Sequence, residues 1–214
     1  MLSKVQIMFV QGSFMTMALT VLSLLFGTII GAILGLCKMS KNKLIYGLAT
    51  FYIWIFRGTP LILQLFFFYY ALPLISPVLK LDPFPAAVIG LSLNSGAYMA
   101  EIVRGGILAI DKGQFEASKA LGFTYTQTMV KIVFPQAFRV IIPPVGNEFI
   151  SMLKDTSLVS TIAMVELMKT ATNIASTTFK YPEMLSLAAI FYLLMTTIFT
   201  TGFSYIEKKL SIYA

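Results

Sequence analysis

A few ionisable side chains interrupt long apolar stretches of this sequence, and they are the residues that could do chemistry. Arg57 and Glu148 each fall near the middle of an apolar run, and Glu101 lies toward the end of another. A charge at the centre of an inserted helix costs about 2.5–3.5 kcal/mol, so such residues usually face an interior or a pathway. A carboxylate there suits a cationic group. We therefore expect recognition of a small charged ligand rather than covalent chemistry.

Composition excludes several kinds of site. The 214 residues are 57% hydrophobic and 12% charged, which is typical of a polytopic membrane protein. The sequence has no His and one Cys, Cys37, which excludes His-based zinc sites, Ser-His hydrolysis and a disulfide framework. It has no GxxxxGK followed by Ser or Thr, so no ATP-binding loop is expected. We expect neither a metal site nor a catalytic constellation.

The net charge of +7 fits the excess of Lys and Arg on cytoplasmic loops better than it fits binding of nucleic acid. With the amino terminus outside the cell, most lysines and arginines fall on the cytoplasmic side. This orientation places the carboxyl terminus and the polar segment 111–137 in the cytoplasm. No cleavable signal peptide is expected, because the first long apolar run, from about Ser13, is too long and lacks a basic start.

Five apolar runs predict an all-α membrane protein that forms a single domain over residues 1–214. The expected transmembrane helices cover about 13–36, 44–72, 86–107, 138–158 and 185–206, with a short amphipathic helix within 160–181. Gly27, Gly31 and Gly35 form a stripe of small residues that lets another helix approach the first span closely. Pro143 and Pro144 should kink or loosen the fourth span.

The second span contains a break, Phe56-Arg57-Gly58-Thr59-Pro60. Gly58 and Pro60 disfavour a continuous helix, and Thr59 followed by Pro60 is a good N-cap and first helical residue. A second half-helix starting at Thr59 would present free backbone N–H groups at bilayer depth, where they suit a carboxylate.

The polar segment 111–137 predicts a short helix over Glu116–Gly122, because Ala and Leu favour helix and Gly122 is a natural stop. Phe115, Lys119 and Phe123 recur every four residues and would share one face. Such a helix beside a membrane either lies on the bilayer surface or fills a groove on a partner.

This segment resembles the EAA motif of binding-protein-dependent ABC importer permeases. The resemblance rests on Glu116-Ala117-Ser118, Gly122 and, nine residues later, Ile132-x-Phe134-Pro135. Ser118 replaces an Ala of that pattern and Phe134 replaces a Leu. In the family this segment is a cytoplasmic coupling helix that docks on an ATPase. The coupling residues implied are Glu116, Ala117, Ser118, Ala120, Leu121 and Gly122.

Further motifs resemble the polar amino acid branch of these permeases, of the arginine, histidine and glutamine type. They are the break with Leu61, Gln64 and Leu65, the stretch 97–107, Lys112-Gly113-Gln114, and Lys154-Asp155-Thr156-Ser157-Leu158. The resemblance implies a multi-pass permease of the bacterial inner membrane, surrounded by lipid. Its partners would be a second permease subunit, identical or a sibling, an extracytoplasmic binding protein and ATPase subunits. The ATPase would bind ATP and Mg, so this chain itself would need no cofactor and would not be an enzyme.

The expected amino acid site lies at the bilayer midplane beside the broken span. Glu148 suits a cationic group, with Asn94 or Ser157 as neutral partners. Asp155 could screen cations at the entrance or simply end its helix. The expected substrate-binding residues are Arg57, Gly58, Thr59, Leu61, Gln64, Asn94, Tyr98, Glu148, Asp155 and Ser157.

Several alternatives stay open. Arg57 could pair structurally with Glu148 or Glu101, and Glu101 with Arg104 favours a clasp near the interface. The substrate expected is a basic amino acid, arginine, lysine or histidine, moved by alternating access. Glutamine is the rival if Arg57 neutralises Glu148. A proton-coupled secondary transporter using Glu148 is another class, although five spans do not divide into two equal repeats. A membrane enzyme is a third.

Overall fold

The computed structural model describes residues 2–211, and every regular element in that range is helical. Four segments are long and apolar enough to cross a membrane: Lys4–Cys37, Pro83–Leu108, Tyr125–Ile162 and Tyr181–Leu210. A fifth candidate is the pair Lys43–Gly58 and Leu61–Ile75, which is bent by 103° at its break. By length and composition, the five expected spans correspond to these four segments and one broken one.

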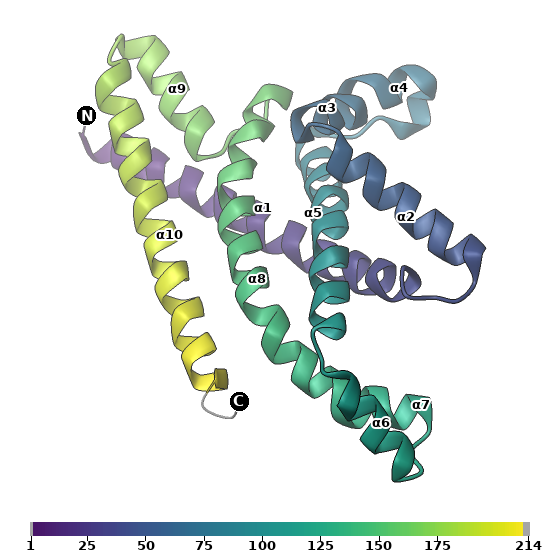
Figure 1. Ribbon diagram of the computed structural model, residues 1–214. Coiled ribbons are helices and arrows are strands. Elements are labelled where there is room, and N and C mark those ends of the chain that lie inside the picture. Colours follow the sequence, from purple (N-terminus) through teal and green to yellow (C-terminus); the bar gives the residue numbers. More distant parts are fainter. Residues whose placement is uncertain (1, 212–214) are drawn as a thin grey trace.

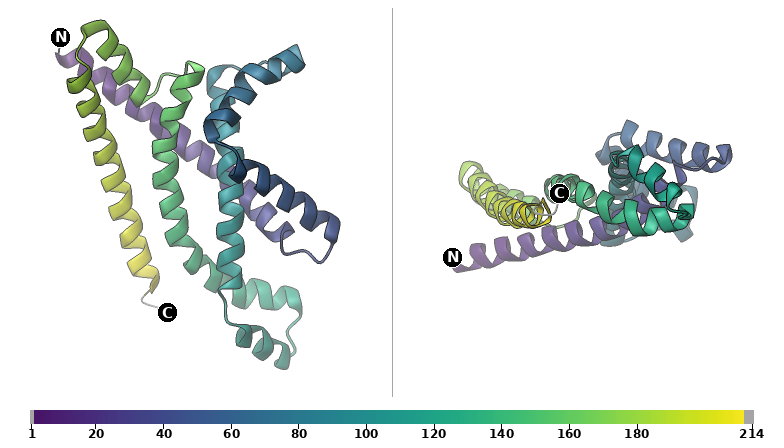
Figure 2. Two further views of the ribbon diagram at one scale, coloured as in Figure 1. Left: turned by 45° about the horizontal axis from the view of Figure 1, so that its top comes forward. Right: turned by 60° about the horizontal axis from the view of Figure 1, so that its bottom comes forward.

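Helix α1 (Leu2–Cys37) crosses α5 (Pro83–Leu108) along the predicted glycine stripe (Figures 1 and 2). A Cβ atom added at Gly31 would lie 2.4 Å from Met99 Cβ, and one at Gly27 would lie 2.8 Å from Ser95 Cβ. The glycines therefore permit a close approach of the two helices, as expected. The helix itself begins at Leu2, well before the expected start near residue 13.

The second span is broken where the sequence predicts it. Helix α2 (Lys43–Gly58) is followed by α3 (Leu61–Phe66), a π-helical turn η1 (Phe67–Ala71), α4 (Leu72–Ile75) and a 3-10 turn η2 (Pro77–Leu79). The predicted start of the second half at Thr59 is wrong. Thr59 instead ends α2, and its Oγ1 donates a 2.8 Å hydrogen bond back to the carbonyl of Ile55. Pro60 precedes α3 without a side-chain cap.

After α5 the chain forms two short helices, α6 (Lys112–Ala120) and α7 (Tyr125–Thr128), and a π-helical turn η3 (Met129–Val133). Helix α8 (Phe134–Asp155) follows and runs without interruption through Pro143 and Pro144. A 3-10 segment η4 (Thr156–Ile162) then leads toward the last two helices. The candidate span Tyr125–Ile162 is thus longer than the expected 138–158 at both ends, mainly at its amino-terminal side.

Helix α9 (Leu167–Thr178) is the short helix expected within 160–181, and α10 (Tyr181–Ser211) extends the expected fifth span at both ends. Glu166 is fully buried before α9. Its carboxylate accepts hydrogen bonds from the backbone N–H of Met168 and Lys169, and from the hydroxyls of Thr16 and Tyr192. One side chain therefore joins α1, α9 and α10.

The two ends of the bundle carry different elements (Figure 1). The start of α1 and helix α9 lie at one end, whereas α6, α7 and the end of α10 lie at the other. This separation fits the predicted placement of the termini on opposite sides of the membrane. Which end faces the cytoplasm stays a prediction.

Candidate functional site

The break between α2 and α3 is held by two buried amide side chains. Gln64 Nε2 donates to the carbonyls of Phe56 (2.9 Å) and Thr59 (3.1 Å) and to Thr59 Oγ1 (2.9 Å). Asn94 Nδ2 donates to Gln64 Oε1 (3.0 Å) and to the carbonyl of Phe56 (3.2 Å). Carbonyls at a helix end have no partner within the helix, so these bonds satisfy them. Gln64 and Asn94 thus support the broken span, and contact of either with substrate stays a prediction.

Glu148 lies on α8 and is partly buried. Its Oε1 accepts a 3.1 Å hydrogen bond from Ser95 Oγ on α5. Asp155 follows seven residues later at the end of α8, two helical turns away and on the same face. Neither carboxylate forms a salt bridge with another residue of the described range 2–211. Helix α8 therefore presents an acidic face, made of Glu148 and Asp155, that forms no salt bridge in this range, and Lys154 adjoins Asp155 at its end.

Arg57 forms no salt bridge with a carboxylate of residues 2–211. Its guanidinium carbon lies 5.2 Å from the centroid of the Tyr98 ring, which is the geometry of a cation–π contact. The alternative in which Arg57 pairs with Glu148 or Glu101 is therefore wrong for this structure.

Glu101 forms the expected clasp with Arg104, through bonds of 3.0 Å from Nε and 2.8 Å from Nη2. It also accepts a hydrogen bond from Lys38 Nζ, which the sequence did not indicate. The bond from Lys38, the residue after α1, thus ties the end of α1 to α5.

Two cavities of about 370 and 410 Å³ share Arg57, Tyr98 and Glu101 in their walls. Tyr98 comes three residues after Ser95 on α5, so it lies one turn from the contact between Ser95 and Glu148. Glu148 lines neither cavity, but Pro144, one turn before it on α8, lines the smaller one, which therefore lies among α2, α5 and α8. Gly58 lines one of the cavities, Leu61 begins α3 and Ser157 lies in η4.

The residues of the EAA-like motif divide between an exposed and a buried side of α6. Glu116, Ala117, Ala120 and Leu121 are exposed, whereas Ser118 is buried. The Ser118 hydroxyl donates to the carbonyl of Phe115 (2.9 Å) and accepts from Thr128 Oγ1 (2.9 Å). The departure from Ala at this position is thus compatible with packing, because the added hydroxyl has partners.

Gly122 ends α6 in a left-handed conformation, with φ +77°. The N–H of Phe123 bonds to the carbonyl of Ser118 (3.0 Å) and the N–H of Gly122 to that of Lys119 (3.0 Å). This pair of bonds is the Schellman motif, which favours Gly at its left-handed residue. The predicted helix stop is confirmed, and Figure 1 shows α6 at the far end of the molecule, away from α9.

A protein-family model described as "Binding-protein-dependent transport system inner membrane component" matches residues 27–212. The chain belongs to this family. It is therefore a membrane component of a transport system and not an enzyme in its own right, as the resemblance implied.

Among curated proteins, the chain is 48% identical over 205 residues to the arginine transport system permease protein ArgU of Corynebacterium glutamicum. The match covers 90% of this chain but only 65% of that relative's length. It is 37% identical to the glutamine transport system permease protein GlnP of Escherichia coli K12, over 95% of this chain and 93% of the relative.

Among solved structures, the chain resembles one described as an amino acid ABC transporter with histidines. The TM-score is 0.91 at 39% identity, and the match covers 97% of this chain and 96% of the other. Coverage of nearly the whole of both chains extends the family relation beyond the EAA-like motif to all the helices.

Proposed function

We propose that this chain is a permease subunit of an ATP-driven amino acid importer and that its substrate is a basic amino acid. The observation that carries the proposal is the Glu148 carboxylate, which is bonded to Ser95 and forms no salt bridge in the described range. A charge inside a membrane needs a partner. The ammonium or guanidinium group of a bound substrate would supply one.

The acidic face of α8 supports a cationic substrate over a neutral one. A second carboxylate, that of Asp155, lies two turns beyond Glu148 on the same helix. A neutral pocket was expected only if Arg57 paired with Glu148 and neutralised it. Arg57 instead lies over the Tyr98 ring, so this argument for a neutral substrate does not apply. The relative named for arginine and the structure described with histidines agree with this substrate class.

Arg57 is our candidate for the substrate carboxylate. The guanidinium is exposed and lines both cavities beside Tyr98, so a bound carboxylate could reach it without breaking an ion pair. An amino acid held between Arg57 and Glu148 would bridge α2 and α8. Relative movement of these helices would then change the affinity of the site.

The expected cycle needs partners. An external binding protein would deliver the amino acid, and closure of the ATPase subunits around ATP would be transmitted through the exposed face of α6. The helices would rock as rigid bodies and open the site to one side at a time. A second permease subunit would enclose the path, because five spans alone are few for this purpose.

Transport into proteoliposomes tests the proposal. The complex purified through this chain would be supplied with its binding protein outside and ATP inside, and uptake of labelled arginine would be measured. The proposal predicts ATP-dependent uptake that excess lysine or histidine suppresses and excess glutamine does not.

The glutamine alternative, supported by the relative named for that amino acid, predicts the reverse competition. Uptake driven by a proton gradient without ATP would instead indicate a secondary transporter.

A further inference from the structure

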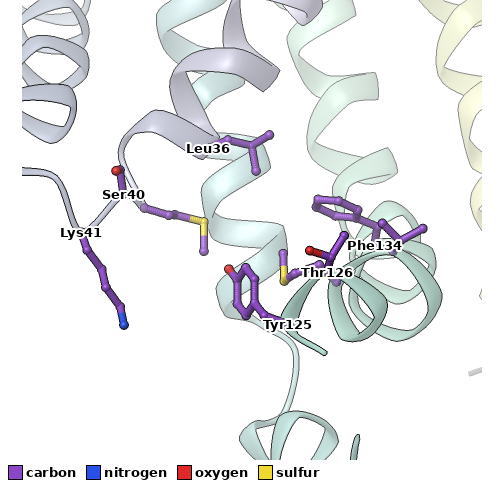
Figure 3. A pocket seen from close by; sticks show the side chains of 9 residues that line it. Leu36, Ser40, Lys41, Tyr125, Thr126 and Phe134 are labelled. Carbon is purple, nitrogen blue, oxygen red and sulfur yellow. The ribbon is translucent and has the colours of Figure 1, made fainter. Parts of the chain in front are cut away.

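A separate cavity lies between the end of α1 and the start of the segment that leads into α8. Its volume is about 570 Å³, within the range of sites that hold small molecules. Figure 3 shows Leu36 above, Ser40 and Lys41 on one side, and Tyr125, Thr126 and Phe134 on the other. Met39, Met129 and Val130 complete the lining. None of these side chains belongs to the substrate site proposed above.

The lining is divided between apolar and polar groups. The apolar part of the lining suits a hydrocarbon chain. It consists of Leu36, Met39, Met129, Val130 and Phe134. The ammonium of Lys41 and the hydroxyls of Ser40, Tyr125 and Thr126 provide hydrogen-bond donors. This amphipathic lining matches a molecule with an apolar tail and a polar head.

The charge around the cavity has one sign. The two stretches that line it, 36–41 and 125–134, contain no Asp or Glu and hold Lys38, Lys41 and Lys131, of which Lys41 lines the cavity itself. Lys38 is bonded to Glu101, whereas Lys41 and Lys131 form no salt bridge in the described range. The cavity therefore favours an anionic head group.

The cavity also lies where a lipid head group would be found. Its walls come from the end of one candidate membrane span, Lys4–Cys37, and the start of another, Tyr125–Ile162. Tyr125, 71% exposed, has the amphipathic ring that is enriched at the membrane boundary. Basic pockets between membrane helices are suited to anionic lipid head groups.

We propose that this cavity binds an anionic phospholipid. Lys41, with the hydroxyl donors, contacts the phosphate, and one acyl chain lies against Met129, Val130 and Phe134. Transfer of the acyl chain from the bilayer to the cavity changes its free energy little, because both surroundings are apolar. The charge of the head group therefore sets the selectivity. Such a lipid would link the loop after α1 to η3, next to α6.

Native mass spectrometry of the complex purified through this chain in neutral detergent tests the site. The complex would be titrated with phosphatidylglycerol and, in parallel, with phosphatidylethanolamine carrying the same acyl chains. We expect phosphatidylglycerol to bind more tightly. Lys41→Gln should weaken phosphatidylglycerol binding roughly five-fold and leave phosphatidylethanolamine unchanged, because one lysine near an anionic head group has about this effect. Val130→Trp, which fills the apolar side at a 56% exposed position, should weaken both lipids.

Lys112→Gln is the matched control, since it removes an exposed lysine at the same end of the molecule but outside the cavity. It should bind phosphatidylglycerol like the wild type. Equal binding of the two lipids by the wild type, or full binding by Lys41→Gln, would overturn the proposal. So would displacement by glycerol phosphate at equal concentration, which would show that the head group alone is the ligand. Binding only after removal of the ATPase would overturn it as well, because the cavity would then be an interface with that subunit.

Discussion

The side-chain amides of Gln64 and Asn94 are joined by a hydrogen bond of 3.0 Å, and both donate to the carbonyl of Phe56 at the end of α2. This pair links the two halves of the broken span to α5. The break is thus stabilised by side chains that replace the missing helical partners of the carbonyls. A structural requirement explains these polar residues before any contact with substrate is invoked.

Replacement of Asn94 by Ala should destabilise the protein even without substrate. The change leaves Gln64 Oε1 with one donor fewer in a buried site, which costs about 1–3 kcal/mol. Thermal unfolding in detergent should show a lower Tm, whereas Asn147→Ala, at an exposed amide on α8, should not change it. An unchanged Tm for Asn94→Ala together with weaker arginine binding would mean that Asn94 is a ligand and not a support.

Gly31→Ala should separate α1 from α5. The new Cβ would lie 2.4 Å from Met99 Cβ and 2.8 Å from the backbone nitrogen of Ala100, so the helices must move. Such overpacking costs about 1–3 kcal/mol and should lower the Tm. Gly47→Ala is the matched control, because nothing lies within 4 Å of its added Cβ and Ala favours a helix. Equal effects of the two substitutions would contradict the close approach.

Gly122→Ala should impair coupling and leave substrate binding intact. A left-handed conformation costs an L-residue about 1–2 kcal/mol, and the φ of +77° would strain the end of α6 although the surroundings are open. We expect normal arginine binding but reduced uptake and reduced substrate-stimulated ATP hydrolysis. Gly122→Asn should retain more activity, since Asn tolerates this conformation. If Asn were as damaging as Ala, backbone strain would not be the cause.

Glu166 should make stability depend on pH. Burial raises the pKa of this carboxyl, and its hydrogen bonds from Met168, Lys169, Tyr192 and Thr16 only partly oppose that effect. The folded state then holds the proton more tightly than the unfolded state. The resulting stabilisation is present below the unfolded pKa of about 4.3 and is lost as pH rises through the folded value. The Tm of the wild type minus that of Glu166→Gln should fall as pH increases, and a difference that grows with pH would contradict this sign.

Sequence patterns predicted the elements of the fold well, because hydropathy, small-residue spacing and helix-stop residues act locally. The five apolar regions, the close approach of another helix at Gly31, the break at Gly58–Pro60 and the helix stop at Gly122 all agree with the structure. The start of α1 was missed, because the polar residues before Ser13 weaken the apolar signal without preventing a helix.

Side-chain pairing was predicted less well, because it depends on helices that are distant in sequence. Thr59 caps the preceding helix and not the following one. Arg57 contacts the Tyr98 ring instead of the carboxylate that was expected as its alternative partner. Lys38 joins Glu101 across 63 residues of sequence. The structural role of Glu166 is not predictable from the sequence. A single Glu in a segment of mixed polar and apolar residues gives no signal that three helices will surround it.

Equilibrium binding of labelled arginine tests the central claim, a cation site at Glu148, most directly. The complex would be purified through this chain without its binding protein, as wild type and as Glu148→Gln, with glutamine as competitor. We predict saturable arginine binding that glutamine does not displace and that Glu148→Gln weakens by about tenfold or more, the expected loss of a charged hydrogen bond. Arginine binding that glutamine displaces and that Glu148→Gln leaves unchanged would contradict the claim and make Glu148 a structural residue.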